Sequence, residues 1–419
     1  MEVIAPSSTT ASEPRVNAVR PISIRRATDA LLVVLFVAGI ALPLLGMKFR
    51  GHGWDIAARG ENRKMAAEPR IFHLGENAPV TNRARVSGLA HFPGEFKAYL
   101  GDHFGFRNLL IKLHGMLMVE GLHTTSTHMV ELGKDGWLYL ANDGSIEDYR
   151  NLEPWTDEEL AQWRQVIEER QAFCDKLGIK YLFVVAPSKH DIYPEYMPDR
   201  LTRVREESRF DQLLAYMKQH GSKVDIVDLR PTLLEAKKST NLRLFQKTDT
   251  HWNDHGAWAA YLTIMQRAKA KVPGVRILSP SDFAPAVKTV PGMDLARLLG
   301  LNDQLSEESF NLDAQIPLRL PHVIQDDVIP INIEGPGPRV VVFRDSFLTA
   351  PLPWIAEGFG HGVYFWEDGF DTDVVTREKP DIVIQEIAQR KFMQPAQGLR
   401  LTQKVKYENG KWVAIGLNP

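Results

Sequence analysis

The stretch RVVVFRDSFLTAPLPWI (339–355) decides the fold class of this chain. Its first residues, RVVVF (339–343), form a β-branched apolar run that is typical of a strand buried on both faces of a parallel sheet. A short helix is predicted near 350–357, so Ser346 falls where the strand turns into the helix. Such a turn lies at the carboxyl edge of a parallel sheet, beside helix amide groups that can hold an anion. The stretch therefore predicts an α/β fold with Ser346 exposed at that edge.

The same alternation of strand and helix runs through the chain from about residue 130. Strands are predicted at 136–140, 181–187, 224–229, 362–366 and 381–386, and helices at 157–178 and 210–221. Strands separated by helices predict a mostly parallel sheet flanked by helices. Residues 275–337 are rich in proline and show no clear period, so we interpret them as an insertion that could rim a functional site.

Length and composition exclude several classes of protein. A chain of 419 residues can bury one large core, or one domain with a substantial insertion. The net charge is −2 at pH 7 and there is no basic stripe, so no nucleic-acid partner is expected. Cys174 is the only cysteine, which excludes an intrachain disulfide framework and a zinc site built from several cysteines.

The amino-terminal region predicts a membrane anchor. Residues 30–47 (ALLVVLFVAGIALPLLGM) are 18 consecutive residues without a charge, just long enough for a spanning helix. The four arginines of the preceding tail favour a cytoplasmic amino terminus, although Lys48 and Arg50 weaken that bias. No A-x-A-like site follows closely, so an uncleaved single-pass anchor is expected. Residues 1–29 would then be a cytoplasmic tail and 48–85 a linker to a domain outside the cytoplasm.

A second segment, KTDTHWNDHGAWAAYL (247–262), supplies acid–base residues. Asp249 and His251 are two positions apart, which puts them on the same side of an extended or turn segment. Asn253 is a suitable N-cap for the helix that follows. His251 is therefore predicted on a loop just before a helix, with Asp249 beside it as an orienting carboxylate.

Ser346, His251 and Asp249 are the residue types of a nucleophile, a base and an orienting acid. A serine hydroxyl is a poor nucleophile at neutral pH and needs a base within hydrogen-bonding reach, itself held by a third group. The pattern alone leaves simpler interpretations open. Ser346 or Asp345 could be only an N-cap, and Asp249 and His251 could be surface loop residues.

A metal site is a further alternative. His251 and His255 are four positions apart, like zinc ligands on one helix face. The glutamate of an H-E-x-x-H motif is absent, because Trp252 follows His251, and Gly256 would lie inside the helix. We therefore expect no metal and no other cofactor.

Several segments together resemble one known family. DTHW (249–252) and the strand leading into DSF (345–347) are similar to the SGNH-hydrolase-like domain of the alginate O-acetyltransferases. Further segments match that family in the same order: FPGEFKAYLGDHFGFRNLLI (92–111), GKDGWLYL (133–140), APSKHDIYPEYMP (186–198), GMDLARLLGL (292–301) and PDIVIQEIAQR (380–390). The resemblance covers about residues 90–392, and the ordered set is more specific than any single motif.

The resemblance implies a fold and a set of reacting residues. It implies an SGNH-hydrolase-like, flavodoxin-like domain at 86–395, followed by a tail or small hairpin at 396–419. It also implies that Asp249, His251 and Ser346 form a catalytic triad. Ordinary SGNH hydrolases place the serine early and a D-x-x-H pair late. Here the serine is late and the pair is D-x-H, as in a permuted version of the fold.

The donors that would hold an oxyanion are not marked by a motif in this chain. The backbone N–H of Ser346 is expected to be one donor, because it lies at the turn that carries the nucleophile. Arg344 and Gln385 are further candidates for this role.

Three more residues are candidates for substrate contacts. Lys189 and Tyr193 follow the predicted strand 181–187 at its carboxyl end, where ligands of α/β proteins bind, although a capping or solvated role is equally compatible. Trp252 is the aromatic residue best placed to stack on a sugar ring, because it adjoins His251 on a loop.

The activity implied by the resemblance is O-acetylation of an exported polysaccharide through an acetyl-serine intermediate. A membrane-bound O-acyltransferase would supply the acetyl group, and the catalytic domain would lie in the periplasm, anchored in the bacterial inner membrane. Two alternatives stay open: an SGNH-type carbohydrate esterase or deacetylase, and a non-catalytic polysaccharide-binding subunit of an acetylation complex. The sequence does not distinguish alginate from cellulose or other exopolysaccharides.

Overall fold

The computed structural model describes residues 22–48, 66, 82–103, 107–320, 330–367, 369–396, 405–408 and 411–414. The chain divides into two units, Met1–Ile111 and Lys112–Pro419. Most of the predicted linker 48–85, and residues 1–21 of the predicted tail, lie outside the described residues.

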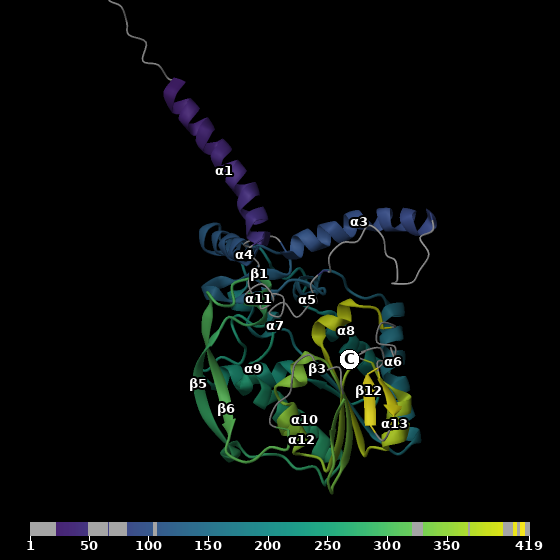
Figure 1. Cartoon of the computed structure of the whole chain (residues 1–419). Coiled ribbons are helices and arrows are strands. Elements are labelled where there is room, and N and C mark those ends of the chain that lie inside the picture. Colours follow the sequence, from purple (N-terminus) through teal and green to yellow (C-terminus); the bar gives the residue numbers. More distant parts are fainter. Residues whose placement is uncertain are drawn as a thin grey trace, which may run out of the picture. The chain divides into compact units, whose positions relative to one another are not determined.

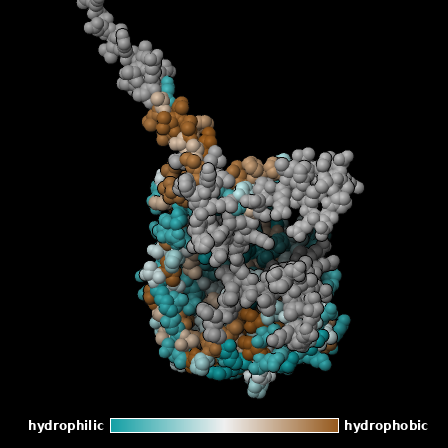
Figure 2. All heavy atoms as spheres, in the orientation of Figure 1, coloured by the Kyte–Doolittle hydropathy of each residue, from teal (hydrophilic) through white to brown (hydrophobic). Residues whose placement is uncertain are grey.

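The first unit is helical where it is described. Its helices are α1 (Ile22–Lys48), α3 (Asn82–His103) and the first part of α4 (Arg107–Met116). Exposed apolar side chains between Leu31 and Ile40 account for the hydrophobic surface of α1 in Figure 2. Among the described residues, no helix is both long and apolar enough to cross a membrane, so the anchor predicted at 30–47 is not confirmed.

The second unit is built around a central sheet (Figure 1). It has six strands in the order β4-β3-β10-β8-β9-β7. The strands are β3 (Lys180–Ala186), β4 (Ile226–Asp228), β7 (Ile331–Ile333), β8 (Arg339–Arg344), β9 (His361–Trp366) and β10 (Ile382–Ala388). Five strands are parallel, and β7 pairs antiparallel with β9 at one edge. The prediction of an α/β fold with a mostly parallel sheet is confirmed.

Side chains of the sheet alternate between two cores, as the two-residue period of a strand requires. Leu182 and Val184 pack on one side, while Phe183 and Val185 pack on the other. The first core includes residues of α9 (Arg230–Ser239), α10 (Asp254–Lys271) and α12 (Leu352–Ala356). The second includes residues of α6 (Asp157–Lys176), α8 (Arg209–Gln219) and α13 (Thr372–Glu378).

The boundaries of α6 and α8 follow from their capping residues. Thr156 and Ser208 each form a capping box at the start of the helix. Gly178 and Gly221, just beyond the helix ends, adopt φ values of 72° and 64°, which glycine reaches without steric cost. The predictions at 157–178 and 210–221 are therefore confirmed to within a few residues.

Shorter elements lie between the strands and helices of the second unit along the chain. Residues 136–140, predicted as a strand, contribute β2 (Leu138–Leu140), which pairs with β1 (Val130–Leu132) in a separate two-stranded sheet. The others are η1 (Leu117–Gly121), η2 (Lys134–Gly136), α5 (Ser145–Arg150), α7 (Lys189–Ile192), η3 (Pro194–Tyr196), η5 (Ser346–Thr349) and η6 (Gln389–Met393).

The segment predicted as an insertion, 275–337, contains a long antiparallel pair. After η4 (Pro280–Asp282) come β5 (Phe283–Pro291), α11 (Asp294–Leu298) and β6 (Ser306–Ala314). Residues 321–329 lie outside the described part. Near the carboxyl end, β11 (Val405–Glu408) and β12 (Lys411–Ala414) pair antiparallel. The predicted turn residues Asn409 and Gly410 are outside the described residues.

Candidate functional site

Ser346 is positioned by the residue that precedes it. β8 ends at Arg344, and Asp345 is the N-cap of η5, where its Oδ1 accepts from the N–H of Phe347 at 2.9 Å. The second oxygen of Asp345 accepts from the N–H of Ala388 at 2.7 Å, at the end of β10. Asp345 therefore fixes the turn against the neighbouring strand. Asp345 is therefore the N-cap that was considered from the sequence. The hydroxyl of Ser346 does not serve as a cap.

Three side chains that are far apart in the sequence form a continuous hydrogen-bonded path. The Oγ of Ser346 lies 2.7 Å from Nε2 of His251, and Nδ1 of the same ring lies 2.7 Å from Oδ1 of Asp249. An ionised carboxylate only accepts, so Nδ1 carries the proton and Nε2 is free to accept from the serine hydroxyl. The structure thus joins the three residues proposed as nucleophile, base and orienting acid.

The loop that carries His251 is closed at its base. Phe245 and Trp252 form an antiparallel bridge, and the N–H of Asn253 donates to the carbonyl of Leu244 at 2.9 Å. The side chain of Asn253 accepts from the first amides of α10, so its predicted N-cap role is confirmed. Gly256 is required here, because a Cβ at this position would lie 2.3 Å from the carbonyl oxygen of Leu244.

The long hairpin of β5 and β6 supports the same loop from outside. Glu307 of β6 is buried and accepts from the N–H groups of Lys247 at 2.6 Å and Thr248 at 2.9 Å. The side chain of Gln246 donates to the hydroxyl of Ser309 at 2.7 Å. The segment predicted to rim the site therefore holds the backbone that presents Asp249.

A second carboxylate, not singled out from the sequence, lies close to His251. Asp294 of α11 accepts from the N–H of Thr250 at 2.8 Å, and its Oδ2 lies 3.9 Å from Nδ1 of His251. Asp249, His251 and Asp294 also have the spacing of a metal-ligand group. Nδ1 of His251 is already bonded to Asp249, so hydrogen bonding accounts for the arrangement. His255, the ligand considered in the zinc alternative, is not part of this group.

The surroundings shift the pKa values of His251 and Asp249 in opposite directions. Burial alone lowers the pKa of His251, but the hydrogen bond and charge of Asp249, with Asp294, outweigh burial and raise it above its ordinary value. Burial alone raises the pKa of Asp249, but its hydrogen bonds and attraction to His251 outweigh burial and lower it. The pair therefore favours a charged acid beside a readily protonated base, as nucleophile activation requires.

Comparisons with known proteins show which proteins this chain resembles. Residues 130–314 match the family described as SGNH hydrolase-like domain, acetyltransferase AlgX. A protein named "Probable alginate O-acetylase AlgJ" from Pseudomonas aeruginosa is 27% identical over 207 residues, which cover 49% of this chain and 47% of the relative. The predicted resemblance to the alginate O-acetyltransferase family is confirmed. This chain spans about half the length of the curated relatives it matches. Ser346 lies beyond the stretch matched by the family.

Solved structures give weaker matches. PatB1 of Bacillus cereus is 16% identical with a TM-score of 0.48, covering 65% of this chain and 100% of that chain. The O-acetyltransferase domain of AlgJ from Pseudomonas putida is 19% identical with a TM-score of 0.40, covering 63% and 92%. The family resemblance therefore rests on the sequence matches.

Lys189, expected from the sequence as a substrate contact, points into the protein. Its side chain is 2% exposed, and its Nζ donates to the carbonyls of Gln246, Lys247 and Asp249 at 3.0, 3.0 and 2.7 Å. Burial lowers the pKa of Lys189 to about 8. Three carbonyls on one ammonium hold the loop that carries Asp249, so Lys189 has the contacts of a positioning residue.

We expect Lys189→Met to reduce kcat about a hundredfold with little change in KM, because a displaced base costs rate without removing a substrate contact. Turnover of an aryl acetate by the full chain would measure this, with circular dichroism melts to confirm folding. Lys134→Met, which removes an exposed lysine paired with Asp199, is the matched control. A raised KM with normal kcat would instead support the substrate contact predicted from the sequence.

Tyr193 and Trp252 were also expected to contact substrate, but both make contacts inside the protein. The hydroxyl of Tyr193 accepts from the N–H of Leu244 at 2.9 Å, and its ring is buried. Trp252 is 3% exposed and packs edge-on against Phe245 and Phe347. A ring enclosed in this way has no face left for a sugar, so the structure does not support stacking by Trp252.

The two side chains considered as oxyanion donors are engaged elsewhere. Arg344 is 1% exposed, donates to the carbonyl of Asp345 and the hydroxyl of Thr349, and lies over the ring of Trp366. Gln385 is fully buried, accepts from Arg170 and Tyr181, and donates to the carbonyl of Gly369. Neither set of contacts supports an oxyanion role. The N–H of Ser346 makes no hydrogen bond within the described part of the chain and stays the best-placed donor.

Proposed function

We propose that this protein is an O-acetyltransferase that acts on an exported polysaccharide through Ser346, His251 and Asp249. The observation that carries the proposal is the path of two 2.7 Å hydrogen bonds from Asp249 through His251 to Ser346. Support for acetyl transfer comes from the matching family, described as an acetyltransferase domain, and from relatives named alginate O-acetylases.

The proposed reaction has two steps with His251 as the proton carrier. Ser346 attacks the acetyl carbonyl of the donor while Nε2 of His251 takes the hydroxyl proton, and the N–H of Ser346 stabilises the oxyanion. Collapse of the intermediate releases the donor alcohol or thiol, which takes the proton, and leaves acetyl-Ser346. A polysaccharide hydroxyl then gives its proton to His251 and attacks the acetyl group, and Ser346 leaves with that proton.

The partners and the location are part of the same proposal. The acceptor is an alginate-like polysaccharide, in line with the names of the relatives. The donor is supplied by a membrane-bound O-acyltransferase, as the family resemblance implies. The uncharged run at 30–47 and its arginine-bearing leader motivate a catalytic domain in the periplasm, tethered to the bacterial inner membrane. Fractionation of cells that produce the full chain would test this location.

The acetyl acceptor distinguishes a transferase from an esterase of the same architecture. Purified full-length protein would be incubated with an aryl acetate, alone and with alginate or a neutral polysaccharide. We expect ester-linked acetyl groups on the polymer, measured by NMR, to appear only when an acceptor and active enzyme are both present. Release of free acetate alone, at a rate independent of polymer, would contradict transfer and support the esterase alternative.

A further inference from the structure

Arg390 is a charged side chain at the site that the reaction above does not use. It lies in η6, directly after β10, and the sequence signal for it was only its place in the family-like segment PDIVIQEIAQR. Within the described part of the chain its guanidinium makes no hydrogen bond and no ion pair, and its Nε is buried without a partner. It lies 5.8 Å from the centroid of the Phe347 ring. A buried donor without a partner is unfavourable unless a ligand satisfies it.

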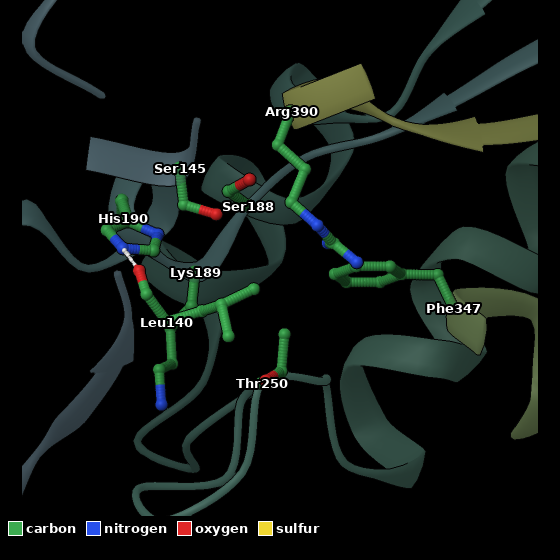
Figure 3. A pocket seen from close by; sticks show the side chains of 8 residues that line it. All are labelled: Leu140, Ser145, Ser188, Lys189, His190, Thr250, Phe347 and Arg390. Atoms are coloured by element: carbon green, nitrogen blue, oxygen red, sulfur yellow. Dashed lines mark hydrogen bonds between the residues drawn. The ribbon is translucent and has the colours of Figure 1, made fainter. Parts of the chain in front are cut away.

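Arg390 lines a small pocket beside the nucleophile (Figure 3). The pocket has a volume of about 10 Å³ and is lined by Leu140, Ser145, Ser188, Lys189, His190, Thr250, Phe347 and Arg390. Thr250 and Phe347 are the chain neighbours of His251 and Ser346. A group bound there would therefore lie close to the residues that are proposed to react.

Other polar atoms in the pocket also lack partners. The hydroxyls of Ser145 and Ser188 are buried, with side chains 1% and 5% exposed, and neither makes a hydrogen bond in the described structure. Figure 3 shows both hydroxyls directed into the space that Arg390 reaches from the opposite side. Two hydroxyls and one guanidinium thus converge on one cavity, which is the pattern of a binding site with a few placed polar groups.

The pocket carries a net positive charge. Nε2 of His190 lies 2.9 Å from the carbonyl of Leu140, so that nitrogen bears the proton. Burial lowers the pKa of His190 to about 3, so the ring is neutral. The ammonium of Lys189 is turned away to the loop carbonyls. No carboxylate is among the lining residues, and Arg390 is the cation whose side chain is directed to this space.

Two acids that contact η6 through Gln389 are engaged by other groups. The side-chain amide of Gln389 donates to Asp148 at 3.2 Å and to Asp191 at 2.9 Å. Asp191 also forms an ion pair with Arg203 at 2.8 Å. These contacts leave Arg390 as the cation that faces the cavity, and they keep the wall behind it fixed.

We propose that this pocket is a carboxylate-binding subsite in which Arg390, Ser145 and Ser188 donate hydrogen bonds. Its volume of about 10 Å³ is far below the roughly 300–1,000 Å³ of sites for drug-sized ligands, so it accepts one carboxylate oxygen and not a sugar ring. Its role rests on the proposed function: the carboxylate belongs either to an acidic unit of the acceptor polymer or to free acetate. Guanidinium and carboxylate form charge-assisted hydrogen bonds, which are the strong class.

The free-carboxylate arm compares acetate with acetamide, which has nearly the same shape but no charge. The protein is the full chain with Ser346→Ala, so that binding is measured without chemistry. We expect acetate, and not acetamide, to bind in calorimetric or NMR titrations, and Arg390→Gln to weaken acetate binding at least about tenfold. Arg267→Gln, which removes an exposed arginine paired with Asp225, is the matched control and should leave binding unchanged.

The polymer arm uses an acidic oligosaccharide and its carboxyl-reduced, neutral counterpart on the same proteins. If the acceptor supplies the carboxylate, Arg390→Gln will weaken binding of the acidic oligosaccharide only. Either arm supports the proposal. Less than a twofold change in both arms, with folding confirmed by thermal melts, would overturn it. Loss of ester turnover in an Arg390→Gln single variant without any change in binding would also overturn it, because Arg390 would then act on the oxyanion.

These titrations are independent of the acetyl-transfer assay. If Ser346→Ala fails to affect acetylation, the proposed function is wrong while carboxylate binding can still be present. If carboxylate binding is absent while transfer depends on Ser346, only the subsite is wrong.

Discussion

Ser346→Ala is expected to reduce acetyl transfer by about 10⁴- to 10⁶-fold, the range found when the nucleophile of a serine triad is removed. The loss is expected because the Ser346 hydroxyl, which lies 2.7 Å from Nε2 of His251, is the atom that receives the acetyl group in the proposed reaction. Polymer acetylation and aryl-acetate turnover should fall together. Mass spectrometry of wild-type protein treated with the donor should show one acetyl group on the peptide that contains Ser346, and the variant should show none.

The control for Ser346→Ala is Ser306→Ala, which removes an exposed hydroxyl at the start of β6. It should retain wild-type rates. Normal acetylation of polysaccharide by a folded Ser346→Ala protein would contradict the enzyme proposal. It would favour the alternative in which the chain only binds polysaccharide within an acetylation complex.

Asp249→Asn is expected to lower kcat by about 10⁴-fold, because the amide cannot accept from Nδ1 in the way a carboxylate does and the ring is left in the wrong tautomer. The pH profile gives a second readout. The base must be neutral, so wild-type activity falls on the acid side as pH drops through the raised pKa of His251. Without Asp249 this pKa falls, and the acid limb of the residual activity should move to lower pH.

Asp294→Asn is the comparison variant for the same loop. Its carboxylate is a weaker influence on His251 than Asp249 is, so the acid limb should move in the same direction by less, with most of kcat retained. An equal effect of both variants would contradict the assignment of Asp249 as the orienting acid.

The pair also predicts how stability depends on pH. The lowered pKa of Asp249 contributes stability that is present above its ordinary value of about 3.8 and lost as pH falls through the folded value. The raised pKa of His251 contributes stability that is present below about 6.5 and lost as pH rises through the folded value. The difference in Tm between wild type and Asp249→Asn should therefore be largest between about pH 4 and pH 6.5.

Local patterns predicted the elements that place the reacting groups. The apolar run ending before Ser346 and the N-cap at Asn253 are properties of a few adjacent residues, and both were found as expected. The direction in which a side chain points depends on the whole sheet. Gln385 pairs with Phe343 and faces the α6 side, and a position at the carboxyl end of a strand does not reveal this.

The residues that were missed from the sequence, or given another role, depend on contacts between distant segments. Lys189 donates to a loop about 60 residues away, and Glu307 reaches the same loop from the inserted hairpin. A lysine that follows a strand can point into solvent, contact a substrate or donate to buried carbonyl groups, and the sequence does not distinguish these three cases. The sequence did not single out Arg390 within its family-like segment. Whether an arginine that follows a strand has a hydrogen-bonding partner depends on the packing around it, which the sequence does not show.

The hairpin that carries Glu307 has a consequence for how such proteins can be recombined. The N–H groups of Lys247 and Thr248, in the His251 loop, have their acceptor on the hairpin strand β6, at Glu307, which is 60 and 59 residues away in the sequence. Consider a chimaera that receives residues 247–262 from a homologue but keeps its own strand β6. In it, the loop with Asp249 and His251 would be held by a strand from a different protein. The smallest transferable piece of the candidate site is thus the loop together with strand β6, and not the DTHW motif by itself.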